Sequence, residues 1–242
     1  MRIPRFYEPL LQAGMDQLEL SESVAQHALK VLRMREGERL RLFNGQGLEF
    51  LAELLPASRR SAQARLLESI PQHSESSLRI ELGQALSRGE RMDFAIQKAT
   101  ELGCAQITPL FTERCEVRLD AQRQDKRQRH WQQIAISACE QSQRQVIPEI
   151  THPVPLQDWL SDCQADLKLV LDPHQALSLG EHPRPQSIAL LIGPEGGLSA
   201  EEIELARNQG FFPLTLGPRV LRTETAPVAA CAILQYLWGD LS

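Results

Sequence analysis

The chain has 242 residues, of which 42% are hydrophobic and 24% charged, a composition typical of a globular protein with one large or two modest domains. No apolar run approaches the roughly 20 residues of a membrane-spanning helix, and the N-terminus lacks the apolar core of a signal peptide. Five widely spaced cysteines without a Cys-x-x-Cys pair argue against a zinc site or a disulfide framework. We therefore expect a cytoplasmic protein with no metal and no membrane anchor.

The net charge of −5 is unevenly distributed along the chain. Residues 1–71 hold ten Lys and Arg against nine Asp and Glu, and residues 86–145 hold ten against eight. Residues 146–242 hold five against twelve. The first two-thirds of the chain can thus supply a local basic cluster for phosphate, although a solvated surface of mixed charge fits these counts equally well.

Residues 1–71 predict a small β-rich unit with one helix. The helix is expected from an N-cap at Ser21 to about Met34, and Gly37 stops it. Strands are expected at 39–43, 48–54 and 61–70, the first two joined by a hairpin turn at Asn44-Gly-Gln-Gly47. The polar, turn-rich stretch 71–77 predicts a linker, and we place the domain boundary between residues 72 and 73.

From Leu78 onward the pattern changes to alternating strands and helices. Strands are expected at 78–85, 105–110, 167–171 and 188–192. Helices are expected at 88–102, 120–145, 156–163 and 226–238. This alternation predicts an α/β domain with a mainly parallel sheet covered on both faces.

Two glycine-rich loops near the C-terminus carry the most information. The strand at 188–192 runs into Gly193-Pro-Glu-Gly-Gly197, and Ser199 with Glu202 forms a capping box for the next helix. The second apolar run leads into Leu216-Gly-Pro-Arg-Val-Leu-Arg-Thr-Glu-Thr225, where Thr223 or Thr225 is expected to cap the last helix. Ligands of open α/β sheets bind beyond the carboxyl ends of the strands, so these loops predict a small-molecule site formed mainly by backbone.

The loops do not match the common phosphate-binding patterns. No Gly-Lys-Ser/Thr follows the first loop, its spacing differs from Gly-x-Gly-x-x-Gly, and Glu195 would repel phosphate. A tight turn without a ligand is the structural alternative, and a surface ion pair is the alternative for Arg222 and Glu224. No nucleophile with its base is apparent, which favours group transfer from an activated cofactor, a reaction that mostly needs two reactants held in position.

Several blocks of the sequence resemble one family. Leu190-Leu-Ile-Gly-Pro-Glu-Gly-Gly197 and Leu216-Gly-Pro-Arg-Val-Leu-Arg-Thr-Glu-Thr-Ala226 are similar to the cofactor loops of the SPOUT class of knotted RNA methyltransferases. More narrowly, they resemble the RsmE family, the 16S ribosomal RNA (uracil-N3) methyltransferases. The similarity extends to His27–Arg33, Gln84–Asp93, Gln97–Gly103 and Glu140–Arg144 with Pro148. One departure is Arg88, where the family most often has lysine.

The resemblance implies a fold and a cofactor site. It implies a PUA-like β-barrel domain that helps to hold RNA at 1–72 and a trefoil-knotted α/β SPOUT domain that binds S-adenosylmethionine (SAM) at 73–242. The cofactor residues carried over from the family lie in the two loops and at two strand ends: Leu171, Leu191, Gly193, Pro194, Glu195, Gly196, Leu216, Gly217, Leu221, Arg222 and Thr223. The predicted function is methylation of N3 of a uridine in 16S ribosomal RNA of the small subunit. Arg222 is the candidate to stabilise the charge that develops during transfer.

Partners follow from charge and from the last helix. Arg5, Lys30, Arg33, Arg35 and Arg88 are the candidates for RNA phosphate contacts, unless Glu36 and Glu38 neutralise Arg33 and Arg35. The helix at 226–238 is apolar on nearly all faces, which predicts burial all round and, with the family resemblance, a homodimer. Cover by the long helix from Asp120 is the alternative within one chain. Alternative functions are methylation of another RNA target, a non-catalytic RNA-binding assembly factor, and a phosphate or nucleotide binder.

Overall fold

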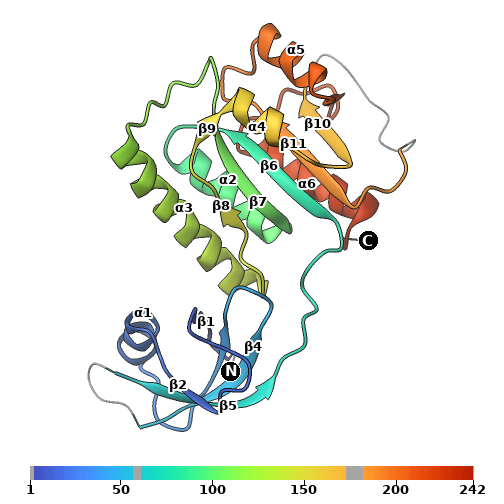
Figure 1. The fold of residues 1–242 in the computed structure, drawn as a ribbon. Coiled ribbons are helices and arrows are strands. Elements are labelled where there is room, and N and C mark those ends of the chain that lie inside the picture. Colours follow the sequence, from blue (N-terminus) through green and yellow to red (C-terminus); the bar gives the residue numbers. More distant parts are fainter. Residues whose placement is uncertain (1–2, 57–60, 173–181, 242) are drawn as a thin grey trace. The chain divides into compact units, whose positions relative to one another are not determined.

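The computed structural model describes residues 3–56, 61–172 and 182–241 (Figure 1). The chain forms two compact units, the first made of Met1–Glu75 with Cys139–Ile147 and the second of Ser76–Ala138 with Pro148–Ser242. This division falls between Glu75 and Ser76, three residues after the position expected from the sequence. The return of residues 139–147 to the first unit was not predicted, because this segment continues a helical pattern without any change of composition.

The first unit is built on a five-stranded sheet among its described residues. The order is β1 (Arg5–Tyr7), β3 (Arg39–Phe43), β4 (Glu49–Leu54), β5 (Gln63–Ser69) and β2 (Gln17–Glu19). The predicted hairpin is confirmed, since β3 and β4 pair antiparallel on either side of Asn44–Gly47. The two edge strands were missed because three residues are too few to show an alternating pattern.

The helix of the first unit begins after Ser21, as predicted, but it is not a continuous α-helix. α1 (Glu22–Gln26) passes into a π-helical turn, η1 (His27–Val31). The Ser21 side chain makes no capping hydrogen bond. Its backbone N–H instead donates to Glu8 Oε2 at 2.7 Å, so the carboxylate of Glu8 fixes the start of this helix.

The second unit contains a parallel sheet, as the alternating pattern predicted. Along it lie β12 (Phe212–Leu214), β10 (Leu167–Leu171), β11 (Ser187–Ile192), β6 (Arg79–Ala85), β7 (Cys104–Phe111) and β8 (Glu149–Ile150). A short strand, β9 (Val154–Pro155), also pairs with β7. Because all these pairs are parallel, the carboxyl ends of β10, β11 and β12 meet at one edge.

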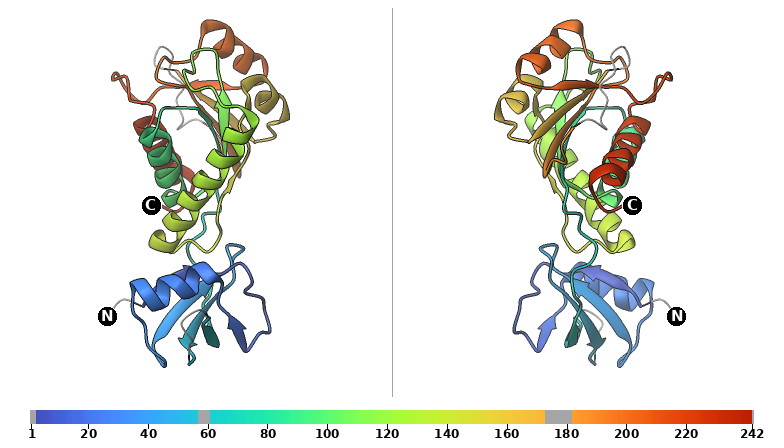
Figure 2. Two further views of the ribbon diagram at one scale, coloured as in Figure 1. Left: turned by 90° about the vertical axis from the view of Figure 1, so that its left-hand side faces the viewer. Right: turned by 90° about the vertical axis from the view of Figure 1, so that its right-hand side faces the viewer.

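Helices cover both faces of this sheet (Figure 2). α2 (Glu90–Glu101) and α6 (Thr225–Trp238) pack together on one face. α4 (Leu156–Asp162) and α5 (Ala200–Asn208) lie on the other, where Trp159 and Ala206 share a buried cluster with Leu191. The long α3 (Ala121–Ser142) borders β8, since Gln128 donates to the carbonyl of Ile150. No helix among the described residues is long and apolar enough to cross a membrane.

The last helix is buried on only one face within its own chain. α6 buries one face, with Leu234 fully covered by its own chain, but it exposes another. The side chains of Ile233, Tyr236 and Leu237 are 39%, 64% and 41% exposed. The helix is therefore not buried on all faces within one chain, and its outer surface is apolar.

Candidate functional site

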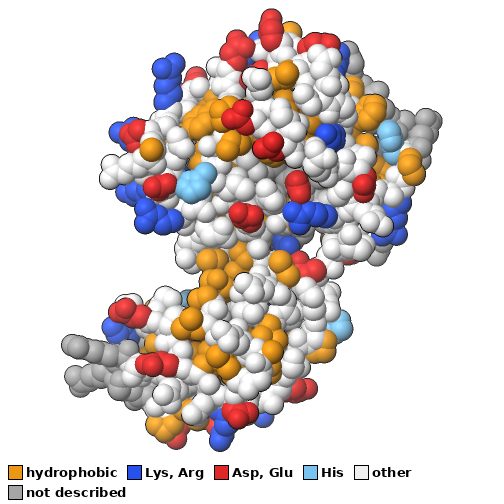
Figure 3. Space-filling view, viewed as in Figure 1, with side chains coloured by type: hydrophobic (Ala, Val, Ile, Leu, Met, Phe, Trp, Pro, Cys, Tyr) orange, Lys and Arg blue, Asp and Glu red, His pale blue; other side chains and the backbone are white. Residues whose placement is uncertain are grey.

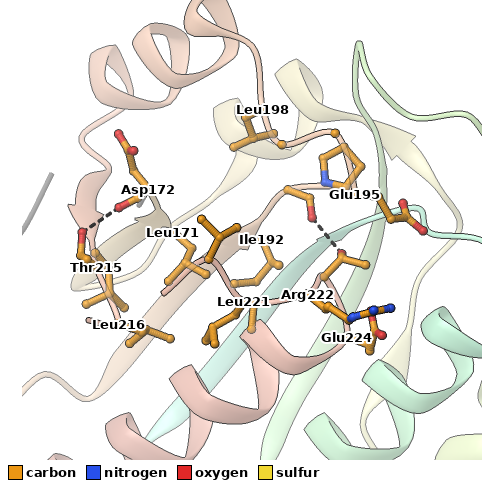
Figure 4. Close-up of a pocket in the computed structure, with 18 of the residues that line it drawn as sticks. Leu171, Asp172, Ile192, Glu195, Leu198, Thr215, Leu216, Leu221, Arg222 and Glu224 are labelled. Carbon is orange, nitrogen blue, oxygen red and sulfur yellow. Dashed lines mark hydrogen bonds between the residues drawn. The ribbon is translucent and has the colours of Figure 1, made fainter. Parts of the chain in front are cut away.

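A cavity of about 520 Å³ lies in the second unit where β10, β11 and β12 end (Figure 4). This volume is in the range of small-molecule and cofactor sites. Leu171 and Asp172 enter from β10, and Ile192–Leu198 from β11. Residues 214–217 and 219–224 line the other side. The two glycine-rich loops predicted from the sequence thus face one common space.

The first wall is the glycine loop, residues Gly193–Gly197. The predicted capping box is confirmed: Glu202 N–H donates to Ser199 Oγ, and Ser199 N–H donates to Glu202 Oε2. Gly196 lies so close to the segment after β7 that an added Cβ would come 3.2 Å from Arg114 Cβ. Arg114 also donates to the carbonyl of Gly196 at 3.1 Å, which fixes the loop from outside.

The second wall is residues 215–224, called here the 215–224 segment. Gly217 has φ +84°, a conformation that residues with a side chain rarely adopt. The Thr215 hydroxyl donates to the carbonyl of Asp172 at 2.7 Å, and Asp172 N–H donates to the carbonyl of Leu214 at 3.0 Å (Figure 4). These bonds hold the segment against the end of β10.

Thr223 does not cap the last helix, and neither does Thr225. The N-cap residue of α6 is Glu224, without a side-chain capping bond. Thr223 is buried, and its hydroxyl donates to the carbonyl of Gly193 at 2.9 Å (Figure 4). The sequence pattern suggested a cap, whereas the tertiary contact joins the two walls of the cavity.

Charged groups are concentrated around this cavity. Glu195 accepts a hydrogen bond from the Arg91 guanidinium at 2.9 Å and another from the backbone N–H of Arg88 at 3.2 Å. Partial burial raises the pKa of Glu195, but hydrogen bonds from its own backbone, from Arg88 and from Arg91 outweigh burial and lower the pKa below its ordinary value. Glu195 is thus an anion tied to the rim and a poor proton acceptor.

Arg222 and Arg219 are exposed cations at the cavity whose guanidinium groups are not paired with any described carboxylate. Both line it and are exposed, and neither forms an ion pair in the described part of the chain. Arg222 and Glu224, both in the described part of the chain, form no ion pair with each other, so the alternative of a surface ion pair is not observed. Arg222 therefore keeps its guanidinium available for a negatively charged group that enters the cavity.

Ten of the eleven predicted cofactor residues line the cavity, and Leu191 does not. Leu191 is fully buried in the cluster beneath α4 and α5, because successive side chains of a strand point to opposite faces. Its neighbour Ile192 lines the cavity instead. Sequence reasoning also missed Arg91, Arg114, Asp172, Leu198 and Thr215, whose positions depend on how distant segments come together.

Arg5 corrects the prediction of an RNA contact. Its side chain is 4% exposed and forms an ion pair with the fully buried Glu49 at 2.9 Å. It also donates to the carbonyls of Cys139 and Arg144 at 2.6 and 2.8 Å. Arg5 therefore holds the segment 139–147 within the first unit and is not available to a phosphate.

The other predicted RNA contacts are at the surface. Lys30, Arg33 and Arg35 are exposed in the first unit. The backbone N–H of Arg35 bonds Glu38, but its guanidinium forms no ion pair with described residues. Arg88, in the second unit, is exposed and forms an ion pair with the equally exposed Glu116 at 2.6 Å. No group of three His, Cys, Asp or Glu side chains among the described residues could hold a metal ion.

Comparisons with known proteins show the family of the chain. The profile of a family described as "RNA methyltransferase domain" matches residues 74–235, and that of an "RNA methyltransferase PUA domain" matches residues 20–67. The chain belongs to this RNA methyltransferase family. It is 40% identical to ribosomal RNA small subunit methyltransferase E of Buchnera aphidicola, over 100% of this chain and 99% of that protein. The family assignment made from the loop motifs is therefore confirmed.

Solved structures extend the match to the whole fold. Ribosomal RNA small subunit methyltransferase E from Neisseria gonorrhoeae, bound to SAM, is 40% identical with a TM-score of 0.93 over 100% of both chains. A Legionella pneumophila protein, in complex with the bound cofactor SAM, is 45% identical with a TM-score of 0.95, again over 100% of both. The family therefore has members that combine this fold with that cofactor.

Proposed function

We propose that this chain is a SAM-dependent methyltransferase that acts on N3 of a specific uridine in 16S ribosomal RNA of the small ribosomal subunit. The observation that carries the proposal is the cavity formed by two glycine-rich loops at the carboxyl ends of parallel strands. The SAM-bound relatives support it, because they share the fold over the full length of the chain.

The residues of the cavity fit this cofactor. Leu171, Ile192, Leu216 and Leu221 offer apolar contacts for an adenine ring, and the backbone of the two loops offers hydrogen bonds. Asp172, Glu195 and Glu224 place carboxylates around a space that would receive a positively charged sulfonium and ammonium. When bound, SAM supplies an electrophilic methyl group.

Arg222 can assist methylation at N3 of uracil by stabilising negative charge on the base. N3 of uracil carries a proton at neutral pH, and this proton must leave before or during formation of the new N–C bond. An exposed guanidinium that lines the cavity can stabilise the negative charge that develops on the uracil ring. N3 also lies on the pairing edge, so the target uridine must be unpaired or flipped out when it reaches the cavity.

We infer that the chain is trefoil-knotted. β12 lies at one edge of the sheet beside β10, yet α6 packs on α2, and Cys231 Sγ lies 3.4 Å from Cys104 Sγ of β7. Between them the 215–224 segment crosses the ends of the strands and contacts the glycine loop through Thr223. This crossing supports the knot implied by the family, and a crystal structure that traces the complete chain tests it.

RNA contacts are proposed on exposed cations only. Lys30, Arg33, Arg35 and Arg88 remain candidates. Figure 3 shows further Lys and Arg side chains along the edge of the second unit that α3 forms. Exposed cations occur at or just before this helix at Arg118, Arg123, Lys126, Arg127 and Arg129. Such cations can neutralise phosphates without reading the sequence of the RNA.

We also propose a homodimer through the outer face of α6. Ile233, Tyr236 and Leu237 lie exposed on this helix, and Phe94 of the adjacent α2 is 44% exposed. Leu237→Asp should therefore yield a folded monomer, because it places a charge in the proposed interface and not in the core of the chain. Asp at Leu234, which is fully buried within the chain, should unfold the protein instead. Light scattering with thermal unfolding separates the two, and a native chain that is monomeric and active at micromolar concentration overturns the proposal.

Methyl transfer to ribosomal RNA tests the main proposal. Small subunits and free 16S RNA that lack the modification are incubated with the protein and labelled SAM, and the labelled base is identified by mass spectrometry. We expect N3-methyluridine at one position. Label on another base or atom indicates a different RNA methyltransferase, and SAM-independent RNA binding without transfer indicates an assembly factor. Tight binding of a nucleotide in place of SAM indicates a nucleotide binder.

A further inference from the structure

Gln84 occupies an unusual position beside the two walls of the cavity. It is the penultimate residue of β6 and is fully buried. Its Nε2 donates to the Thr223 hydroxyl oxygen and to the carbonyl of Ala85, both at 3.2 Å. Gln84 does not itself line the cavity. Any effect it has on a ligand must therefore pass through Thr223.

The direction of these hydrogen bonds is fixed by the chemistry of the groups. The Thr223 hydroxyl has one proton, and the carbonyl of Gly193 at 2.9 Å can only accept it. The Thr223 oxygen must then accept from Gln84, so the amide nitrogen of Gln84 faces Thr223. A directed chain of two bonds thus runs from β6 through the 215–224 segment to the glycine loop.

The amide oxygen of Gln84 lies in an unfavourable environment. Its Oε1 is buried and has no hydrogen-bond partner in the part of the chain that the structure describes. A buried acceptor without a donor is costly, and an apolar side chain of the same length would avoid this cost. Stability alone therefore does not favour glutamine at this position, whereas donation to Thr223 requires it.

We propose that Gln84 is a positioning residue for the cofactor site. By donating to Thr223, it holds the 215–224 segment at the distance from the glycine loop that the ligand requires. This inference rests on the proposed binding of SAM. It assigns Gln84 no contact with the cofactor, the RNA or the reacting atoms.

The test combines two substitutions and their double variant. Gln84→Met removes the donors at nearly constant volume, and Thr223→Val removes the hydroxyl at nearly constant shape. We expect each to weaken SAM binding by roughly 3- to 10-fold or more, the effect of one or two net hydrogen bonds. The double variant should be little worse than Thr223→Val, because both changes break one chain of bonds. Titration calorimetry gives the affinities.

Controls separate positioning from a general loss of structure. Thr223→Ser keeps the hydroxyl and should recover most of the SAM affinity that Thr223→Val loses. Gln128→Met makes the same exchange at a glutamine whose side chain donates to the carbonyl of Ile150, away from the cavity, and it should not change SAM affinity. Hydrogen exchange of the Gly193–Leu198 amides, measured without cofactor, should accelerate in Gln84→Met while the thermal midpoint stays close to that of the native protein.

Native SAM affinity in Gln84→Met with unchanged exchange overturns the proposal, and so does a double variant whose loss equals the product of the two single losses. If Gln84→Met does not fold, Gln84→Leu removes the same donors and carries the same expectation. A native protein that fails to bind SAM rejects the proposed function, while the exchange measurement still tests the positioning role.

Discussion

Two groups of charged side chains, one around Glu49 in the first unit and one around the cavity of the second, have opposite roles. In the first unit Glu49 is fully buried, and Arg5 and Arg41 form ion pairs with it at 2.9 and 2.7 Å. Around the cavity of the second unit, Arg219 and Arg222 are exposed and form no ion pair with described residues. Charges of the first kind hold chain segments together, and charges of the second kind remain available to a ligand. Replacement of an arginine is therefore expected to reduce the stability of the protein at the buried cluster and the rate of methyl transfer at the cavity.

The largest expected effect is on the stability of the first unit. Arg5→Met leaves Glu49 with one cation fewer and frees the carbonyls of Cys139 and Arg144. Removal of one partner from a buried ion pair costs about 3–5 kcal/mol, which urea unfolding will measure. Arg65→Met, which breaks an exposed pair with Glu53, is the matched control and should cost less than about 1 kcal/mol. Equal losses in the two variants would contradict the comparison.

The next effect is on the rate of methyl transfer. Arg222→Ala removes the cation that we expect to stabilise the uracil anion, and the single-turnover rate should fall about 100-fold. The unfolding midpoint should change little, since Arg222 is exposed and unpaired within the described chain. Arg222→Lys should recover part of the rate because it keeps the charge. A native rate in Arg222→Ala removes this residue from the mechanism.

The third effect concerns the backbone of the cavity. Gly217 and Gly210 have nearly the same φ, +84° and +83°, and both have open space at the Cβ position. Gly217→Val and Gly210→Val should each lower the free energy of unfolding by about 1–2 kcal/mol, because a β-branched residue rarely adopts this conformation. Only Gly217→Val should also abolish SAM binding in a calorimetric titration, since Gly217 lines the cavity and Gly210 does not. Unchanged affinity in Gly217→Val argues against a site between the two loops.

Elements with a long, regular pattern were predicted well from the sequence. β10 and β3 have their predicted bounds, and α6 begins one residue early. Short edge strands such as β1 and β12 contain three residues, which is too few for a period to show. The helix predicted at 120–145 ends three residues earlier in the structure, at Ser142 of α3. The prediction ran too far because the polar pattern of α3 continues into the segment that returns to the first unit.

The site was predictable where it depends on local sequence and unpredictable where it depends on long-range contacts. The glycine loop and its capping box are visible as a motif within ten residues. Arg5 looked like a surface cation because its partner Glu49 lies 44 residues away in the chain. Thr223 looked like a cap because its acceptor, Gly193, lies 30 residues away. Such partners emerge only when the fold brings the segments together.

A smaller effect is expected on RNA affinity. Arg33→Glu and Arg88→Glu, one in each unit, should each weaken RNA binding several-fold at moderate salt. The slope of log affinity against log salt should fall by about one for each phosphate that the protein no longer neutralises. Arg65→Glu, an exposed arginine outside the proposed surface, is the control. A double variant of Arg33 and Arg88 that binds and methylates RNA normally would reject this surface.

The smallest effects are those of two carboxyl groups whose pKa values shift in opposite directions. In the first unit, burial raises the pKa of Glu140, although hydrogen bonding to the Tyr7 N–H and the charges of His27 and Arg5 oppose it. In the second unit, the hydrogen bonds to Glu195 lower its pKa despite partial burial. The ordinary value for both is 4.5. These directions give the two units opposite pH dependences.

The sign follows from which protonation state each fold prefers. The raised pKa of Glu140 favours its neutral form, so its contribution to stability is full below pH 4.5 and declines as pH rises through the folded value. The lowered pKa of Glu195 favours its charged form, so its contribution is full above pH 4.5 and declines as pH falls through the folded value. Glu140→Gln, which keeps an acceptor for Tyr7 N–H, should therefore stabilise the first unit at pH 7 relative to pH 4. Glu195→Gln should destabilise the second unit at pH 7 and lose part of this effect at pH 4. Urea unfolding of both variants at the two pH values measures the difference, and effects of the same sign in both would refute the opposite shifts.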